Sequence, residues 1–249
     1  ARALETIRDR SGSQARVVCL YNGFDPDDFA HRLPPPQSDS ECYRLVYVGT
    51  LWNLTTVAPL VGAVERLCRE RPDLASRLEL VFAGRRTSAE DETLARLKML
   101  PCRVRLLDYI DHAEAIDLMR SADGLCVLLA DVPGAGRVVP AKIFEYMAAG
   151  RPIRAIAPDG ELCDLVRNHP GTVCISPQNI SAICEQLATD LCRHGSAEAS
   201  KPIAAAPHGS PFSRKRQAAE LASLLEGVAV PKPIPAAPER KPSWAAAGA

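Results

Sequence analysis

Short runs of apolar residues recur along the chain, and most are continuous rather than alternating with polar residues. Continuous runs of this length are typical of strands that are covered on both faces. We therefore expect strands at residues 16–21, 44–48, 78–83, 103–107, 124–129, 152–157 and 172–175. Arg154 interrupts one of these runs, and the pattern gives no reason for its charge.

Segments with a helical spacing of apolar residues separate these runs. They lie near residues 56–70, 88–98, 112–122, 140–149, 159–168, 178–193 and 214–228. Strands that alternate with helices at this spacing indicate right-handed crossovers between parallel strands. The expected fold is therefore α/β: an open, Rossmann-like parallel sheet of about six to seven strands with helices on both faces.

Composition divides the chain into one folded region and its flanks. Residues 1–13 are interpreted as a linker helix or the remnant of a preceding domain, and residues 14–228 as one Rossmann-like domain. Residues 195–213, rich in Ala, Ser and Pro, predict a loose connection to a last helix with Leu221, Leu224 and Leu225 as its apolar stripe. Residues 229–249 contain much proline and little apolar sequence, which predicts a disordered tail.

Charge and cysteine content argue against several classes of protein. Thirty basic residues balance thirty acidic ones, so we expect no general attraction to nucleic acid or to anionic lipid. No apolar run is long enough to cross a membrane. The nine cysteines include no C-x-x-C pair, which favours a reducing, cytoplasmic compartment over a metal site. Cys19, Cys126 and Cys174 lie inside apolar runs, which predicts that they are buried.

The helix near residues 140–149 carries the residues of most chemical interest. The loop before it contains Gly134 and Gly136, and glycines let backbone amides approach a ligand closely. The start of a helix favours a phosphate, and Lys142 adds a positive charge there. Glu145 lies on the same face, and its carboxylate can accept hydrogen bonds from two ribose hydroxyls. On spacing alone, a surface ion pair between Lys142 and Glu145 is the simpler explanation.

Several segments together resemble the glycosyl transferases group 1 family, whose members have the GT-B fold of two facing Rossmann-like domains. The resemblance covers roughly residues 14–228 and implies the C-terminal, donor-binding half of such an enzyme. The matching motifs are Asn22-Gly23-Phe24-Asp25, Val48-Gly49-Thr50, Tyr109-Ile110-Asp111, a helix with Lys142, Glu145, Tyr146, Ala148, Gly150 and Pro152, and finally Phe212-Ser213-Arg214.

The resemblance implies a role for individual residues in binding a nucleotide-sugar. It places Gly49 and Thr50 beside the donor diphosphate, and Tyr109 and Ile110 beside the base. It places Lys142 near the phosphate or the sugar, and Glu145 on the ribose.

The chain departs from the family pattern at two places. Many relatives carry a sugar-binding glutamate eight residues before the ribose-binding one, and Arg137 occupies that position here. Backbone amides of the segment that includes Gly136, Arg137 and Val138 are expected to contact the sugar instead. Many relatives also carry basic residues after the first Gly turn, where this chain has only Thr50, Thr55 and Thr56. A charge from Arg85 or Arg86 is the expected substitute, although an exposed loop explains these arginines equally well.

The resemblance further implies transfer of a sugar from a nucleoside-diphosphate-sugar to a saccharide or lipid-linked acceptor, as in polysaccharide biosynthesis. It implies no cofactor, no metal, an N-terminal acceptor domain in the full-length protein, and peripheral association of that protein with a membrane. We expect no activity without the acceptor domain, and the catalytic residues are unknown, with His112 the best placed of five histidines. The alternatives are a non-catalytic nucleotide-sugar-binding domain and, with nothing in its favour, a sugar-nucleotide epimerase.

Overall fold

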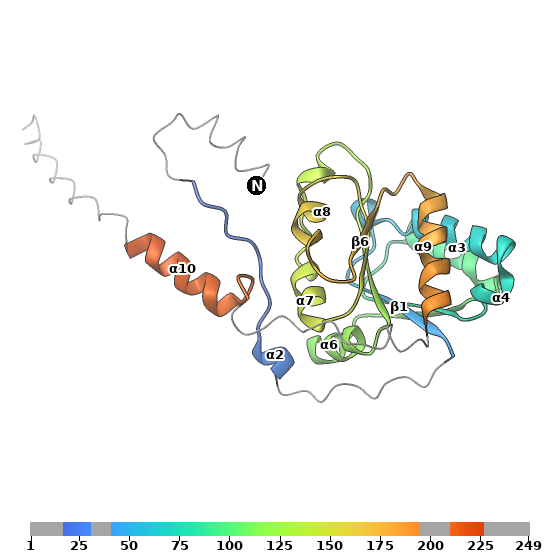
Figure 1. Ribbon diagram of the computed structural model, residues 1–249, viewed down its shortest axis with the longest axis horizontal. Helices are drawn as coiled ribbons and strands as arrows, with labels where there is room; N and C mark the ends of the chain where they lie inside the picture. The colour runs from blue at the N-terminus through green and yellow to red at the C-terminus, as the bar shows by residue number, and fades with distance from the viewer. Residues whose placement is uncertain (1–16, 31–40, 195–209, 227–249) are drawn as a thin grey trace, which may run out of the picture.

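The computed structural model describes residues 17–30, 41–194 and 210–226 of the chain (Figure 1). The expected linker at residues 1–13, most of the loose connection at residues 195–213 and the tail at residues 229–249 lie outside these ranges. No helix in the described ranges is long and apolar enough to cross a bilayer.

Six parallel strands form the sheet, in the order β3-β2-β1-β4-β5-β6. This order confirms the Rossmann-like fold, and it reverses direction between β1 and β4, where ligands bind in such sheets. The strands are β1 (Tyr43–Val48), β2 (Leu78–Ala83), β3 (Arg103–Leu107), β4 (Gly124–Leu128), β5 (Ile153–Ile156) and β6 (Val173–Ile175). Each lies within a residue or so of a predicted run.

Helices cover both faces of the sheet, as Figure 1 shows for α3 and α9 on one side and α7 and α8 on the other. The α-helices are α2 (Asp27–Ala30), α3 (Ala58–Glu70), α4 (Pro72–Ala75), α5 (Ser88–Ala95), α6 (His112–Arg120), α7 (Lys142–Ala149), α8 (Glu161–Val166), α9 (Ile180–Arg193) and α10 (Arg214–Glu226). Three 3-10 turns are η1 (Asn53–Thr55), η2 (Arg96–Met99) and η3 (Ala135–Arg137).

The two faces of the sheet form two hydrophobic cores. In β1, Leu45 and Tyr47 pack with α3 and α9, whereas Val46 between them packs with α6 and α7. Successive side chains of a strand point to opposite faces, so a strand covered on both sides must be apolar throughout. This double burial explains why the sequence runs are continuous.

Residues 16–21 do not form the strand predicted for them, because the described part of this run has no neighbour in the sheet. The chain instead pairs just afterwards with the segment before α10. The Phe24 amide donates to the Phe212 carbonyl at 3.0 Å, and the Arg214 amide donates to the Phe24 carbonyl at 2.9 Å. This parallel bridge fastens the start of α10 to the N-terminal segment, and the two lie side by side in Figure 1.

The expected apolar stripe of the last helix is exposed in the described residues. Leu221 is 46% exposed and Leu225 is 64% exposed, and no side chain of α10 is buried. The helix contacts the N-terminal segment through its first turns, where Lys215 pairs with Asp27 and Gln217 donates to the Asn22 carbonyl.

Arg154, which the sequence pattern left unexplained, forms an ion pair that joins the two sides of one hydrophobic core. Its Nε and Nη2 atoms donate to the two carboxylate oxygens of Asp190 on α9, each at 2.6 Å. Its Nη1 atom donates to the Gly171 carbonyl, also at 2.6 Å. Burial of a guanidinium requires partners of this kind, so the pair holds α9 against β5.

Candidate functional site

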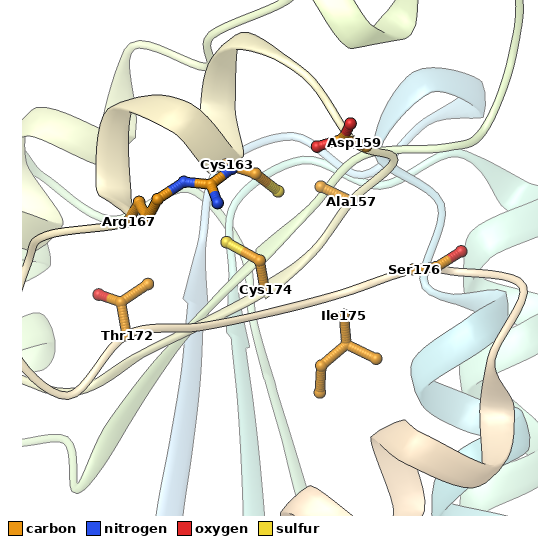
Figure 2. Close-up of a pocket in the computed structure, with 8 residues that line it drawn as sticks. All are labelled: Ala157, Asp159, Cys163, Arg167, Thr172, Cys174, Ile175 and Ser176. Atoms are coloured by element: carbon orange, nitrogen blue, oxygen red, sulfur yellow. The ribbon is translucent and has the colours of Figure 1, made fainter.

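A pocket of about 280 Å³ opens where β1, β2 and β3 end. Its lining includes five of the expected site residues, Gly49, Thr50, Arg85, Tyr109 and Ile110, together with Val48, Ala83, Gly84 and Ala115. The structure therefore brings three loops of the carboxyl edge into one concave surface. A second pocket of about 290 Å³ lies beside β5 and β6 and is lined by none of the expected residues (Figure 2).

Two glycines let the ends of β1 and β2 approach each other at the floor of the pocket. Gly49 and Gly84 have φ angles of +138° and +124°, which side chains other than glycine rarely adopt. A Cβ atom on Gly84 would collide with the Gly49 carbonyl, and one on Gly49 would collide with the ammonium of Lys142. Sequence reasoning missed Gly84, although it follows its strand as Gly49 follows β1.

Lys142 begins α7, and its ammonium lies against the edge of this pocket beside Gly49. The Nζ atom lies 3.8 Å from the centroid of the Tyr47 ring, a cation-π contact. Burial lowers the pKa of Lys142 to about 7, and the nearby Cys126 and Glu145 oppose this shift. A desolvated ammonium in this position gains most by pairing with an anion.

Packing fixes the direction in which α7 presents Lys142. Ile143 and Met147 are buried in the hydrophobic core that also contains α6 and α8, and Gly150 ends the helix in a left-handed conformation with φ of +65°. The hydroxyl of the buried Tyr146 accepts a hydrogen bond from the Val48 amide at 2.8 Å. This bond ties α7 to the end of β1, one residue before Gly49.

Glu145 lies one turn along α7, where it is partly buried. Burial raises the pKa of Glu145, His112 and Arg214 act in the opposite direction, and Asp28 adds to the increase. His112, at the start of α6, is itself 2.9 Å from the Asp28 carboxylate through its Nε2 atom. The histidine therefore links α6 to α2, and the carboxyl of Glu145 lies in a mixed electrostatic environment.

The segment expected to contact the sugar lies outside this pocket. Gly136, Arg137 and Val138 belong to η3 and the residue after it, and Arg137 is exposed. The amides of Arg137 and Val138 donate to carbonyls within this turn. Gly136 packs against the backbone at Asp159, just before α8, at a distance that leaves no room for a side chain.

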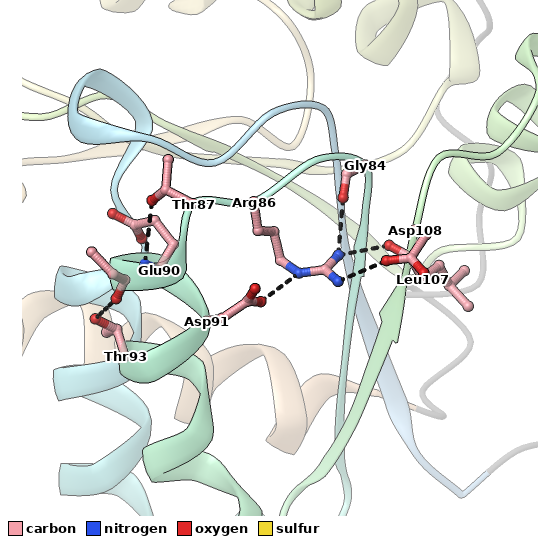
Figure 3. Close-up of polar contacts among 9 residues, drawn as sticks. Gly84, Arg86, Thr87, Glu90, Asp91, Thr93, Leu107 and Asp108 are labelled. Carbon is pink, nitrogen blue, oxygen red and sulfur yellow. Dashed lines mark hydrogen bonds and ion pairs between the residues drawn. The ribbon is translucent and has the colours of Figure 1, made fainter.

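Of the two candidate arginines, only Arg85 lines the pocket. Arg86 donates to the carbonyls of Gly84 and Leu107 and pairs with Asp91 and Asp108, as Figure 3 shows. Arg86 therefore joins the ends of β2 and β3, and its donors are used within the fold.

The threonines after the first Gly turn have unequal roles. The Thr55 hydroxyl donates to the Thr50 carbonyl at 2.7 Å, and the Tyr47 hydroxyl donates to the same carbonyl at 2.9 Å. The Thr56 hydroxyl accepts from the Ala58 amide at the start of α3. Thr50 is the member of this set that lines the pocket.

Metal ligands are not gathered at the carboxyl edge. Within residues 17–30, 41–194 and 210–226, no group of three or more His, Cys, Asp or Glu side chains is arranged to hold a metal ion.

Solved structures with the same fold include several sugar-processing proteins. The lipopolysaccharide outer core galactosyltransferase WaaB is 14% identical, with a TM-score of 0.61 over 89% of this chain and 58% of that one. HepE from Anabaena, solved with UDP and glucose, is 17% identical, with a TM-score of 0.62 over 84% of this chain and 56% of that one. The chain therefore spans little more than half the length of these proteins.

TarM from S. aureus, solved with UDP among its ligands, is 12% identical, with a TM-score of 0.57 over 78% of this chain and 37% of that one. At these identities the structural similarity establishes the fold alone. No curated protein sequence matches the chain.

A sequence family provides the closer assignment. The family described as Glycosyl transferases group 1 matches residues 42–191. This range contains the whole sheet and helices α3 to α9, apart from the last two residues of α9. This match covers more than half of the chain. The chain belongs to the glycosyl transferases group 1 family.

Proposed function

We propose that this domain binds the nucleotide part of a nucleoside-diphosphate-sugar at the carboxyl edge of its sheet. The proposal rests chiefly on one observation: the pocket at the ends of β1, β2 and β3 adjoins the partly buried ammonium of Lys142. A base against Tyr109 and Ile110 and a diphosphate beside Gly49, Thr50 and Lys142 would use this arrangement. Glu145, on the same helix, would bind the ribose hydroxyls.

In this proposal the protein contributes electrostatic stabilisation to sugar transfer. When the bond between sugar and diphosphate breaks, negative charge grows on the leaving diphosphate. The Lys142 ammonium and the exposed guanidinium of Arg85 are the cationic groups at hand, and fixed positive charge of this kind lowers the barrier. No step requires a metal or a cofactor.

The complete reaction needs more than this domain. Because the chain spans about half the length of the solved proteins that it resembles, the acceptor site and the catalytic base belong, in our proposal, to an N-terminal domain of the full-length protein. The acceptor would be a saccharide or a lipid-linked sugar, in cytoplasmic polysaccharide biosynthesis with peripheral attachment to a membrane. The isolated domain would bind the donor without transferring its sugar.

Replacing Glu145 with alanine should weaken binding of the donor nucleotide at least about tenfold, or about 1.4 kcal/mol, because the ribose would lose a hydrogen-bond acceptor for its hydroxyls. Calorimetric titration of nucleoside diphosphates with each base, and of their sugars, against the chain measures this loss. Glu92→Ala, at an exposed glutamate of α5, is the matched control and should leave the affinity unchanged. Equal affinities in both variants would argue against the ribose role, and failure of every nucleotide to bind the unmodified chain would overturn the proposed function.

One observation favours a second candidate, a domain that binds a nucleotide-sugar without transferring it. Arg137, which takes the place of the sugar-binding glutamate of many relatives, is exposed and lies outside the pocket. Assays of the full-length protein with several acceptors separate the two candidates. Donor binding without either hydrolysis or transfer would favour the second.

A further inference from the structure

Two cysteines face each other in the second pocket, between α8 and β6. Figure 2 shows Cys163 on the helix and Cys174 on the strand, with both sulfur atoms directed into the space between these elements. The Cys163 thiol is buried, whereas Cys174 is exposed, contrary to the burial predicted from its apolar run. The edge position of β6 in the sheet explains this exposure.

The surroundings make the two thiols chemically unequal. The Cys163 thiol donates to the Pro158 carbonyl at 3.7 Å. Its interaction with the neighbouring Cys174 sulfur raises the pKa of Cys163 and lowers that of Cys174. Burial of Cys174 and the carboxylates of Asp159 and Asp164 act to raise its pKa, whereas the guanidinium of Arg167 acts to lower it. The net pKa of Cys174 is lowered, so the exposed member of the pair is the one that forms a thiolate more readily.

A second thiol pair in the same domain shows that contact alone does not produce this asymmetry. Cys68 on α3 and Cys102 before β3 also interact with each other, and both are buried in one hydrophobic core. Burial outweighs that interaction, so the pKa of Cys68 is raised and that of Cys102 is raised to about 12. Neither thiol of this pair is both exposed and inclined to ionise, so neither is expected to start an exchange reaction.

We propose that Cys163 and Cys174 form a redox-active dithiol, which closes to an intramolecular disulfide on reaction with a small disulfide such as oxidised glutathione. Because Cys174 is exposed, the disulfide of such a reagent can reach its sulfur from solvent, and Cys163 lines the same pocket. In a reducing compartment such disulfides are usually transient and reversible, and there the reduced pair would be the resting form.

The reaction proceeds in two exchange steps. The Cys174 thiolate attacks one sulfur of the reagent, which forms a mixed disulfide and releases one glutathione thiolate. Cys163 then loses its proton to solvent and attacks the Cys174 sulfur, which expels the second glutathione. In total, the protein dithiol loses two electrons and two protons, and one molecule of oxidised glutathione becomes two of the reduced form.

The test is to incubate the reduced chain with oxidised glutathione, alkylate the remaining thiols under denaturing conditions and map the peptides by mass spectrometry. The proposal predicts one linkage, between Cys163 and Cys174, that dithiothreitol reverses. Cys68 and Cys102 should be recovered as separate alkylated residues. Recovery of Cys163 and Cys174 as alkylated thiols, or a stable glutathione adduct on Cys174 beside a free Cys163, would overturn the proposal.

Single variants separate the roles of the two thiols. Cys163→Ser should accumulate a glutathione adduct on Cys174, Cys174→Ser should lose both adduct and linkage, and the control Cys68→Ser should still form the linkage. In the Cys163→Ser background, Arg167→Gln should raise the pH at which alkylation of Cys174 reaches half its maximal rate. An adduct on Cys163 in the Cys174→Ser variant would contradict the assignment of Cys174 as the attacking thiol.

Discussion

Asp190→Asn should lower the free energy of unfolding by about 3–5 kcal/mol, the cost of leaving a buried charge without its partner. The Arg154 side chain is only 11% exposed and the Asp190 side chain 4% exposed, and two hydrogen bonds join them. Asparagine keeps the shape and one acceptor but removes the negative charge. The guanidinium, held by β5 and by the Gly171 carbonyl, cannot reach water without disturbing the contact with α9.

Urea unfolding monitored by circular dichroism measures this loss, and an exposed ion pair provides its control. The ion pair between Arg66 and Glu70 on α3 has side chains that are 36% and 41% exposed. Glu70→Gln breaks this pair and should lower the free energy of unfolding by about 0.3–0.5 kcal/mol. The double variant Arg154→Met with Asp190→Leu should recover most of the lost stability, because no charge is left buried. If Asp190→Asn lowers the free energy of unfolding no more than Glu70→Gln does, the ion pair does not hold α9 against β5.

Lys142→Met should weaken the binding of a nucleoside diphosphate about ten- to hundredfold, the range expected for losing a hydrogen bond to a charged group. The same change should stabilise the unliganded domain, because methionine removes a desolvated ammonium and keeps the contact with the Tyr47 ring. This opposition between binding and stability is expected of a functional residue. Lys98→Met, at an exposed lysine of η2, should change neither quantity appreciably.

The pH dependence of binding and of stability should also run in opposite directions. Burial lowers the pKa of Lys142 to about 7 in the folded domain, whereas the unfolded chain keeps the proton up to a pKa of about 10.4. Affinity for the diphosphate should therefore fall as the pH rises through about 7, since the ammonium loses its charge. Between these two pKa values the unfolded state binds more protons, so the contribution of Lys142 to the free energy of unfolding should rise with pH.

Calorimetry and urea unfolding on either side of neutral pH measure both trends, and Lys142→Met should abolish them. A trend that persists in this variant would come from another group, and an affinity that does not respond to Lys142→Met would remove Lys142 from the proposed site.

Much of the fold could be predicted from the sequence because double burial leaves a local signature. Most of the six strands are largely apolar runs, whereas the edge strand β3 carries two arginines and is mostly exposed. Helices such as α3 and α9 have an apolar face of the right period. The run at residues 16–21 has a similar pattern, but the strand predicted there is wrong, because a pattern along the chain does not show whether a strand has a neighbour in the sheet. The partner of this segment, around Phe212 and Ser213, lies far away in sequence.

The site was predicted less completely, and the reason is again the distance between contacts in sequence. Gly49, Thr50, Tyr109 and Ile110 were proposed from motifs that resemble those of the family, and the structure brings them together because the carboxyl ends of parallel strands meet at one edge. The contact between Tyr47 and Lys142 could not be proposed, because Tyr47 lies within the strand pattern of β1. Similarly, Arg154 became intelligible only once α9 placed Asp190 against it.

The most direct test of the central claim is to titrate an isotopically labelled sample of the chain with nucleoside diphosphates and to follow its backbone amides by NMR. If the nucleotide binds where we propose, the largest shifts should fall on Gly49, Thr50, Gly84, Ile110 and Lys142, at the ends of β1, β2 and β3 and the start of α7. Shifts centred instead on Cys163 and Cys174, or no shifts with any base at saturating concentration, would contradict the account.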